Sequence, residues 1–393
     1  GGLMATYNLT SAQLDTVLSA TGPTYQTEIT NALFAQGLYP SAPGATIAAE
    51  LVTNSNAGGT NFYNLTSGQE LFIELGTGGN SSAYMIDYVV TPQDAVVALT
   101  GASYTTLIVT GGTSNSILAG DGDFITVIGD GNDILYGGAG ENQILQGLGN
   151  DTLVGGGENY LVAYNAGNTL YGGMSGSAAD TLLSVAGSGA STLMVAYEGN
   201  NLLLGMSGSD TLIGGSGGDQ LLAGLSAGAH DTLIAGSGTN FLQVVEGNNG
   251  LYSSGGNDTL LGGVGSDTLY GGGQSWLLAN GGSATLLGIG ADTLISSTGN
   301  DYLSGGAQIY SGLGGNDTVV GGAGNDEIYN GLGGNDTIYG GGGTDTLIFY
   351  NYTAAEVTVT VNGDGSTLYS FGSGAETKTA LVYNVTNVYF KQV

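Results

Sequence analysis

The sequence has 393 residues, among them 77 Gly, no Cys, 2 Lys+Arg and 32 Asp+Glu, which give a formal charge of −30. So few basic residues exclude binding to nucleic acid or to an anionic membrane surface, and no apolar run approaches the roughly 20 residues that span a bilayer. The lack of Cys excludes disulfides and thiolate metal sites, while 41 % hydrophobic residues in a short period predict a folded, soluble chain.

Residues 1–104 form an amino-terminal zone that begins with two predicted helices. Residues 10–20 place Leu14 and Leu18 on one helical face, and residues 23–37 begin with Pro23 and end at a glycine. From residue 45 onward the pattern changes to short strands separated by Gly, Asn and Ser. We expect a small mixed α+β module that caps the next domain, or alternatively one that docks on the next protomer.

Residues 105–348 repeat a unit of nine, Gly-Gly-x-Gly-x-Asp-x-(Leu/Ile)-x, as in GGVGSDTLY at 262–270 and GGAGNDEIY at 321–329. The glycine half predicts a tight turn that exposes backbone carbonyls, and the second half predicts a short strand whose central Leu or Ile points inward. Two units make one flattened coil, and coils stack because one unit cannot bury its apolar side alone. The predicted fold is an all-β, parallel β-roll.

The Asp slot of this unit carries the candidate metal ligands. With almost no Lys or Arg to pair with them, these carboxylates need metal cations, and oxygen ligands favour a hard cation such as Ca²⁺. The candidate ligands are Asp123, Asp133, Asp151, Asp210, Asp219, Asp231, Asp258, Asp267, Asp292, Asp301, Asp317, Asp326, Asp336 and Asp345. Asp180 occupies the same slot. Uncharged residues take the slot at Asn142, Asn159, Asn168, Ser191, Asn200, Asn240, Asn249, Ser275, Ala284 and Gln308, where we expect less calcium.

On these motifs, over about 240 residues, the repeat zone resembles the hemolysin-type calcium-binding nonapeptide repeats (RTX repeats) of bacterial proteins exported by type I secretion. The resemblance implies a right-handed calcium-binding β-solenoid in which each ion lies between adjacent turns on one edge, held by Asp carboxylates and turn carbonyls. Neighbours on one edge are then alternate units. The same-edge sets expected are Asp210 with Asp231, then Asp301, Asp317 and Asp336, and on the other edge Asp326 with Asp345.

Residues 349–393 read as alternating strands around an Asn-Gly-Asp-Gly turn at 362–365. We expect a β cap on the roll. The resemblance implies that this carboxyl-terminal segment carries the secretion signal and that the protein is extracellular, at the bacterial cell surface. Weak calcium sites of this kind would also be filled outside the cell rather than in the cytosol.

The sequence indicates no enzyme. The only histidine, His230, lies in a turn, where we expect a solvated residue, and Gly-Gly-Ser-Gly-Gly at 214–218 matches the Gly-x-Ser-x-Gly nucleophile motif within a repeat turn rather than a strand-to-helix turn. Aromatic residues on exposed strand positions, Trp276 and Tyr329 among them, are expected either to pack together or to bind sugar.

We therefore expect an extracellular, calcium-dependent structural protein that self-assembles into a surface layer, filament or matrix, so that its partner is itself. The alternative is an adhesin or carbohydrate-binding module that recognises a cell-surface glycan, and the third reading is the non-catalytic domain of a secreted enzyme. We expect the calcium-free chain to be largely unfolded by repulsion among its carboxylates, with ion binding supplying the missing folding free energy.

Overall fold

The computed structural model divides the chain into two compact units, residues 1–202 and 203–393, and each unit is a stretch of β-solenoid with two parallel sheets. The prediction of a parallel β-roll is confirmed. The structure describes residues 3–19, 23–53, 60–65, 71–75, 85–91, 93–100, 105–118, 124–127, 131–138, 142–145, 149–165, 167–173, 179–185, 191–312, 314–331, 333–372 and 377–392.

In the first unit, strands alternate between sheet A and sheet B along the chain. Sheet A contains β1 (Leu3–Leu9), β2 (Ile47–Thr53), β4 (Leu71–Leu75), β6 (Val96–Thr100), β8 (Ser116–Leu118), β10 (Ile134–Tyr136), β12 (Thr152–Val154), β14 (Thr169–Tyr171) and β16 (Leu193–Val195). Sheet B contains β3 (Thr60–Asn64), β5 (Met85–Thr91), β7 (Thr105–Gly111), β9 (Phe124–Val127), β11 (Asn142–Leu145), β13 (Asn159–Ala163) and β15 (Thr181–Ser184). All the described pairs are parallel except β1 with β2.

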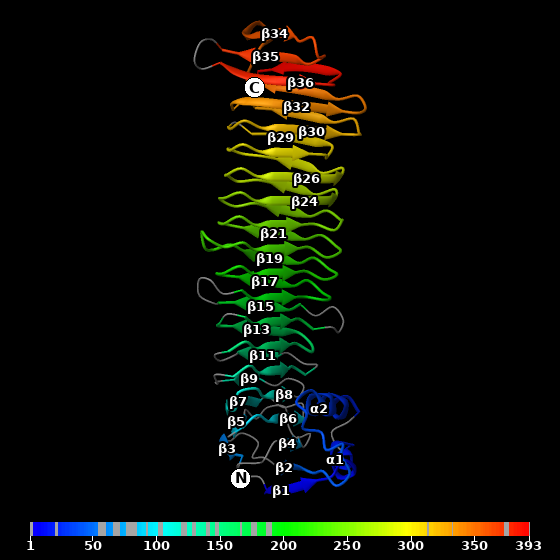
Figure 1. Cartoon of the computed structure of the whole chain (residues 1–393), viewed down its shortest axis with the longest axis vertical. Helices are drawn as coiled ribbons and strands as arrows, with labels where there is room; N and C mark the ends of the chain where they lie inside the picture. The colour runs from blue at the N-terminus through cyan, green and yellow to red at the C-terminus, as the bar shows by residue number, and fades with distance from the viewer. Residues whose placement is uncertain are drawn as a thin grey trace. The chain divides into compact units, whose positions relative to one another are not determined.

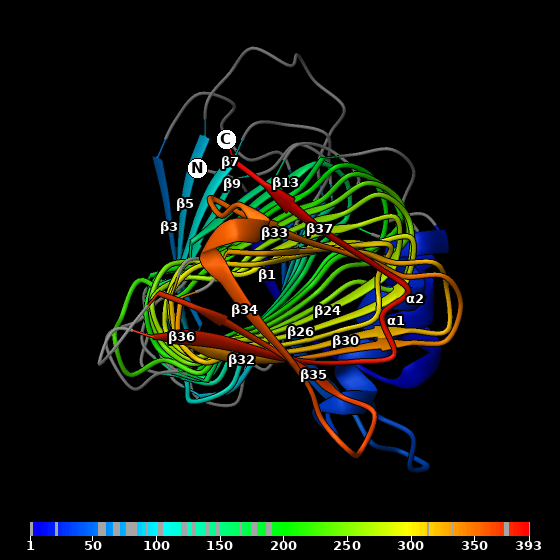
Figure 2. The same ribbon diagram turned by 90° about the horizontal axis from the view of Figure 1, so that it is seen from above.

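The second unit continues the same alternation after β17 (Leu202–Gly205). Sheet A contains β18 (Thr211–Ile213), β20 (Thr232–Ile234), β22 (Gly250–Tyr252), β24 (Thr268–Gly273), β26 (Thr285–Gly290), β28 (Tyr302–Ser304), β30 (Thr318–Gly322) and β32 (Asn335–Gly341). Sheet B contains β19 (Gln220–Ala223), β21 (Phe241–Val244), β23 (Thr259–Leu261), β25 (Trp276–Leu278), β27 (Thr293–Ile295), β29 (Gln308–Ser311), β31 (Glu327–Asn330) and β33 (Thr346–Tyr350). Figure 2 shows the strands of this unit in two layers joined by turns.

The core consists of the central residue of each short strand. Leu212, Leu233 and Leu251 are in register on consecutive strands of sheet A and are fully buried, while the residues on either side are partly exposed. Leu221 and Leu242 form the matching column in sheet B. The alternation follows from the two-residue period of a strand, so stacking the coils joins their separate apolar positions into one continuous core.

The two predicted helices are present as α1 (Ser11–Leu18), capped by Thr10, and α2 (Pro23–Ala35). Leu14 and Leu33 are fully buried in a cluster with residues of β2, β4, β6 and β8, so the helices cover one side of sheet A, as Figure 1 shows. Parallel pairing runs from β5 to β7 and on to β9, so sheet B is continuous across residue 104. Within the described residues, no helix is long and apolar enough to cross a membrane.

The carboxyl-terminal strands extend both sheets of the second unit. Two of them pair in parallel with the preceding coil, and two more form an antiparallel hairpin at the end of sheet A. β36 (Lys378–Tyr383) pairs in parallel with β32, and β37 (Asn387–Lys391) pairs in parallel with β33. After a short 3-10 helix (Ala354–Glu356), β34 (Val357–Val361) and β35 (Thr367–Phe371) form an antiparallel hairpin attached to β36. The predicted turn is present, with Gly365 in the left-handed conformation that favours glycine (φ 89°). The predicted strands of the tail are therefore confirmed.

Candidate metal-binding turns

The Asp slot lies at the end of the glycine turn, directly before the repeat strand or within its first two residues. Every predicted ligand from Asp133 to Asp345 is buried there, and Asp123 lies outside the described residues. Asp180, which occupies the same slot of the repeat, is buried in the same position. Thirteen of the fourteen predicted ligands thus lie in equivalent places, counted over the part of the chain that the structure describes.

Glycine is required in these turns because consecutive turns nearly touch. A Cβ on Gly315, whose φ is +89°, would overlap the carbonyl oxygen of Gly299 in the turn below, and a Cβ on Gly238 would overlap that of Gly217. The turn carbonyls of one coil therefore face the next coil at close range. Such stacked carbonyls are the neutral oxygen ligands that a hard cation needs beside carboxylates.

Side chains in the slot connect successive coils along each edge. The backbone N–H of Asp301 donates to Oδ1 of Asp317 at 2.9 Å, and that of Asp317 donates to Oδ1 of Asp336 at 2.9 Å. Asp210 and Asp231 are joined in the same way at 2.7 Å. These bonds confirm the expected same-edge sets, because each one joins alternate units.

The other edge gives the same result for Asp326 and Asp345, at 3.1 Å. The structure adds a same-edge pair in the first unit, where the N–H of Asp133 donates to Oδ1 of Asp151 at 2.7 Å. In each pair one carboxylate oxygen is used within the protein. Whether a cation is needed depends on whether the second carboxylate oxygen has a hydrogen-bond donor.

At several Asp residues, Asp317, Asp326 and Asp345 among them, the second oxygen has no hydrogen-bond donor within the described residues. Oδ2 of Asp317, Asp326 and Asp345 is buried and accepts no hydrogen bond from any described residue. A buried carboxylate oxygen without a donor is strongly unfavourable unless a cation or a proton neutralises it. These turns therefore fit a hard cation, with the free carboxylate oxygen and turn carbonyls as the ligands that would hold it.

At other Asp residues the protein itself satisfies the second oxygen. Oδ2 of Asp267 accepts the N–H of Gly263 at 2.8 Å, and that of Asp258 accepts the hydroxyl of Ser253 at 2.7 Å. Oδ2 of Asp336 accepts the amide of Asn330 at 2.8 Å. These second oxygens already have donors, so the case for a cation at them is weaker.

Asn in the slot performs a function that sequence reasoning did not specify. The amide of Asn240 donates to Oδ1 of Asp258 at 3.0 Å, and that of Asn249 donates to Oδ1 of Asp267 at 3.1 Å. An Asn below an Asp thus brings a donor to the carboxylate, where an Asp below an Asp brings a second negative charge. An Asn in place of the lower Asp also removes the repulsion between the two carboxylates.

Three assignments within the repeat need correction. The slot residues are Thr192, Asn201 and Ala307 rather than Ser191, Asn200 and Gln308, because the next residue in each case begins the strand and donates its N–H to the carbonyl of a slot residue in the adjacent coil. Thr192 and Asn201 are buried as the slot requires.

The electrostatic cost of the Asp pairs appears in their pKa values. Burial, with repulsion from Asp336 and Asp301, raises the pKa of Asp317 to about 7. Burial and repulsion from Asp345 raise the pKa of Asp326 to about 6. Without a cation these carboxylates hold protons well above the pH at which a free Asp ionises.

No group of three or more His, Cys, Asp or Glu converges on one point within the described ranges. The stacked turn carbonyls are the backbone oxygens that a cation in these turns would use beside a carboxylate. His230 is exposed, and its Nδ1 lies 3.0 Å from the carbonyl oxygen of Asn248. The Gly-x-Ser-x-Gly match at 214–218 lies between β18 and β19, so it is not the strand-to-helix turn of a nucleophile elbow.

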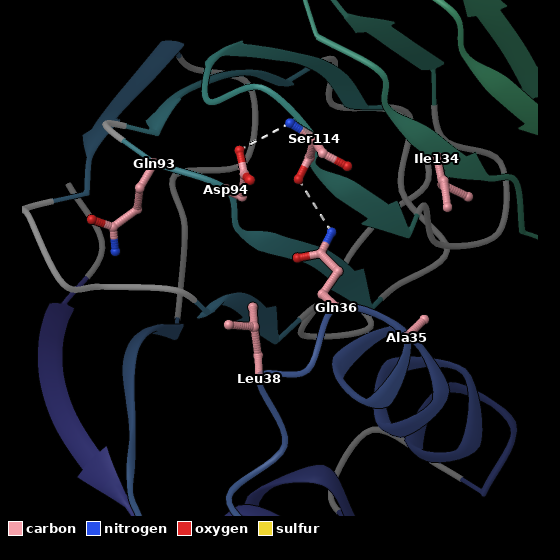
Figure 3. A pocket seen from close by; sticks show the side chains of 7 residues that line it. All are labelled: Ala35, Gln36, Leu38, Gln93, Asp94, Ser114 and Ile134. Carbon is pink, nitrogen blue, oxygen red and sulfur yellow. Dashed lines mark hydrogen bonds between the residues drawn. The ribbon is translucent and has the colours of Figure 1, made fainter.

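A pocket of about 470 Å³ lies in the first unit where α2 ends against the solenoid turns (Figure 3). Asp94 accepts the N–H groups of Thr113 at 2.6 Å and Ser114 at 2.9 Å, and the amide of Gln36 donates to the hydroxyl of Ser116 at 2.8 Å. Hydrogen bonding, chiefly from the backbone of Thr113, lowers the pKa of Asp94. These contacts attach the end of α2 to the solenoid turns.

Comparison with known families agrees with the geometry. The family described as RTX calcium-binding nonapeptide repeat (4 copies) matches residues 129–153, 186–221, 195–228, 245–275, 287–308 and 311–347. No curated protein and no solved structure matches the chain. RTX repeats bind Ca²⁺ and are typical of secreted proteins. Residues 129–347 of this chain are therefore RTX calcium-binding nonapeptide repeats of the hemolysin type.

Proposed function

We propose that the chain is an extracellular, calcium-dependent structural protein that assembles with copies of itself into a surface layer, filament or matrix. The observation that carries the proposal is the way sheet A ends. In the first unit it ends in β1 and in the second unit in β34, and each of these strands pairs with only one neighbour among the described strands. An open strand edge is a template for pairing with another chain unless the protein blocks it.

The buried Asp residues of the roll support the calcium dependence in the same proposal. Buried acidic pairs such as Asp326 with Asp345 fit a cation, and sites built from few carboxylates fill at extracellular rather than cytosolic calcium. The roll would then become rigid only after export. Assembly would follow folding, because the open edges exist only once the sheets have formed.

The experiment is negative-stain electron microscopy of the purified chain in EDTA and in millimolar calcium, with circular dichroism of the same samples. The proposal expects both β-structure and ordered filaments or sheets in calcium. Millimolar magnesium serves as the matched ionic control, because Mg²⁺ keeps its waters and fits such turns poorly. Folded monomers in calcium would contradict self-assembly, and full β content in EDTA would contradict calcium dependence.

A second candidate function, glycan binding, is favoured by one residue. Trp276 is 60 % exposed on β25, where it pairs with Thr259 and Thr293 of the adjacent strands. The neighbouring aromatics are less suitable, because Tyr310 and Tyr329 stack on each other with ring centroids 4.5 Å apart and so cover one face of each ring. Binding on a glycan array that is lost with Trp276→Ala would support this candidate.

A further inference from the structure

We propose that β34 is the contact through which two copies of this chain pair, antiparallel and about a two-fold axis at Val359. The inference deepens the proposed function, on which it rests, by naming the surface and the partner. β34 is the last strand of sheet A in the second unit, beyond β36 and β35 (Figure 1).

The outer edge of β34 lacks the features that normally block pairing. The strand reads Val-Thr-Val-Thr-Val, with no charge, proline or glycine, and four of its five residues are exposed. Val359 is 51 % exposed and Val361 is 75 % exposed. Natural edge strands usually carry a Lys, a Pro or a bulge, so an unblocked edge of this kind points to a partner.

The hydrogen-bond pattern shows which groups are available. The N–H of Asn362 donates to the carbonyl of Ser366 at 2.9 Å, which makes this a hydrogen-bonded pair of the hairpin. Such pairs recur at every second residue, so Thr360 and Thr358 point their backbone groups toward β35. Val357, Val359 and Val361 therefore direct their N–H and C=O groups to the open edge.

A second copy of β34 fits this edge in register. In an antiparallel pair centred on Val359, Val357 of one copy lies opposite Val361 of the other, and Thr358 lies opposite Thr360. Every valine meets a valine on one face and every threonine meets a threonine on the other, which are favourable cross-strand pairs. The three valine positions would exchange about six backbone hydrogen bonds.

The charge distribution selects this end of the chain for self-contact. Residues 346–393 carry a net charge of only −1, because Glu356, Asp364 and Glu376 are nearly balanced by Lys378 and Lys391, and the chain has no other Lys or Arg. Residues 1–345 carry the remaining −29. Two copies with the same charge therefore meet with the least repulsion at the carboxyl-terminal strands.

The test uses cysteine cross-linking, since the chain has no Cys of its own. In the proposed pair Val359 lies opposite itself at the Cα separation of about 5.5 Å that a disulfide tolerates, so oxidised Val359→Cys should run at twice the 39.0 kDa chain mass. Val361→Cys is the matched control, because its two copies lie four residues apart along the strands and cannot be bridged. Equal cross-linking of both variants, or none in calcium, overturns the inference.

A second variant separates this contact from the proposed function. Val359→Pro removes an outward N–H without removing a bond to β35, so the fold should persist by circular dichroism while dimers are lost in sedimentation. Ordered polymers from Val359→Pro would overturn the inference and leave the proposed function standing. Cross-linked dimers without any larger assembly would keep the inference and contradict the proposed function.

Discussion

The backbone N–H of Asp326 donates to Oδ1 of Asp345, one turn later on the same edge, and the second oxygen of each carboxylate is buried without a donor among the described residues. Asn240 and Asp258 stand in the same relation, but there the Asn amide donates to Oδ1 of Asp258 and Ser253 satisfies the second oxygen. The two pairs differ in whether the protein itself supplies hydrogen-bond donors to both carboxylate oxygens.

Asp326→Asn should make its turn less dependent on calcium. The new amide can donate to Asp345 as that of Asn240 does to Asp258, and the repulsion between the two carboxylates disappears. In chelator we expect stabilisation of about 1–3 kcal/mol, the cost of an unsatisfied buried polar group, measured by urea unfolding. One fewer calcium should bind in titration calorimetry. Glu246→Gln, an equal charge change on an exposed turn, is the control, and a destabilised Asp326→Asn chain in chelator would contradict the prediction.

Asn249→Asp should have the opposite effect. It removes the amide that donates to Asp267 at 3.1 Å and to the carbonyl of Glu246 at 2.9 Å, and it places a second charge below Asp267. We expect a loss of about 1–3 kcal/mol in chelator and a higher calcium midpoint for folding by circular dichroism. Asn248→Asp makes the same charge change at the adjacent exposed residue and should leave the midpoint unchanged. Equal shifts for the two variants would show that net charge alone matters.

The calcium-free chain should gain structure as the pH falls. The pKa of Asp317 is raised to about 7, and those of Asp151 and Asp326 to about 6, chiefly by burial, against about 3.9 in an unfolded chain. The folded state then binds more protons than the unfolded state, so this stability is full below pH 4 and is lost as the pH rises through 6 to 7. Melting temperatures in chelator should therefore fall between pH 5 and pH 8.

Calcium should reverse that pH trend, because protons and the cation compete for the same oxygens. Calcium affinity should weaken as the pH falls from 8 to 5. Asp317→Asn removes the group with the highest of these pKa values and should flatten the chelator profile. A melting temperature in chelator that rises with pH would contradict the assignment.

The sequence predicted the solenoid and its edges because the repeat keeps Asp and Leu in fixed phase. It failed at Asn201, where three consecutive leucines, Leu202 to Leu204, hide the two-residue alternation, and only the structure shows that Leu203 is the buried one. The same ambiguity displaced the slot at Thr192, which precedes Leu193 and Met194. When the repeat is aligned one residue out of register, the predicted ligand moves from the interior of the turn to its surface.

The division of the Asp slots into satisfied and unsatisfied ones could not be read from the sequence. Asp267 and Asp345 have the same unit around them, yet a backbone N–H reaches the second oxygen of Asp267 and none of the described donors reaches that of Asp345. Whether a donor reaches the second carboxylate oxygen depends on the backbone conformation of each turn. The pairing of Asn249 with Asp267 likewise depends on which coils are neighbours. In the sequence, the signal for such a pair is an Asn in the slot two units before an Asp.

Removal of calcium should unfold the second unit in parts rather than at once. Residues 292–345 contain the unsatisfied carboxylates of Asp317, Asp326 and Asp345, whereas residues 240–267 contain two Asn-to-Asp pairs with both carboxylates satisfied. Amide hydrogen exchange with mass spectrometry in graded EDTA should therefore show that 292–345 loses protection first. Neighbouring coils in a solenoid stabilise one another only locally, so such partial unfolding is physically accessible.

The control is the combination of Asp317→Asn and Asp326→Asn, which brings an amide below Asp336 and below Asp345 and should delay the loss of protection in 292–345 without affecting 240–267. Addition of calcium, but not of magnesium, should restore protection in the unaltered chain. Simultaneous loss over both segments would mean that calcium acts on the unit as a whole and that the Asn amides do not substitute for it. Earlier loss in 240–267 would reverse the assignment of the two kinds of turn.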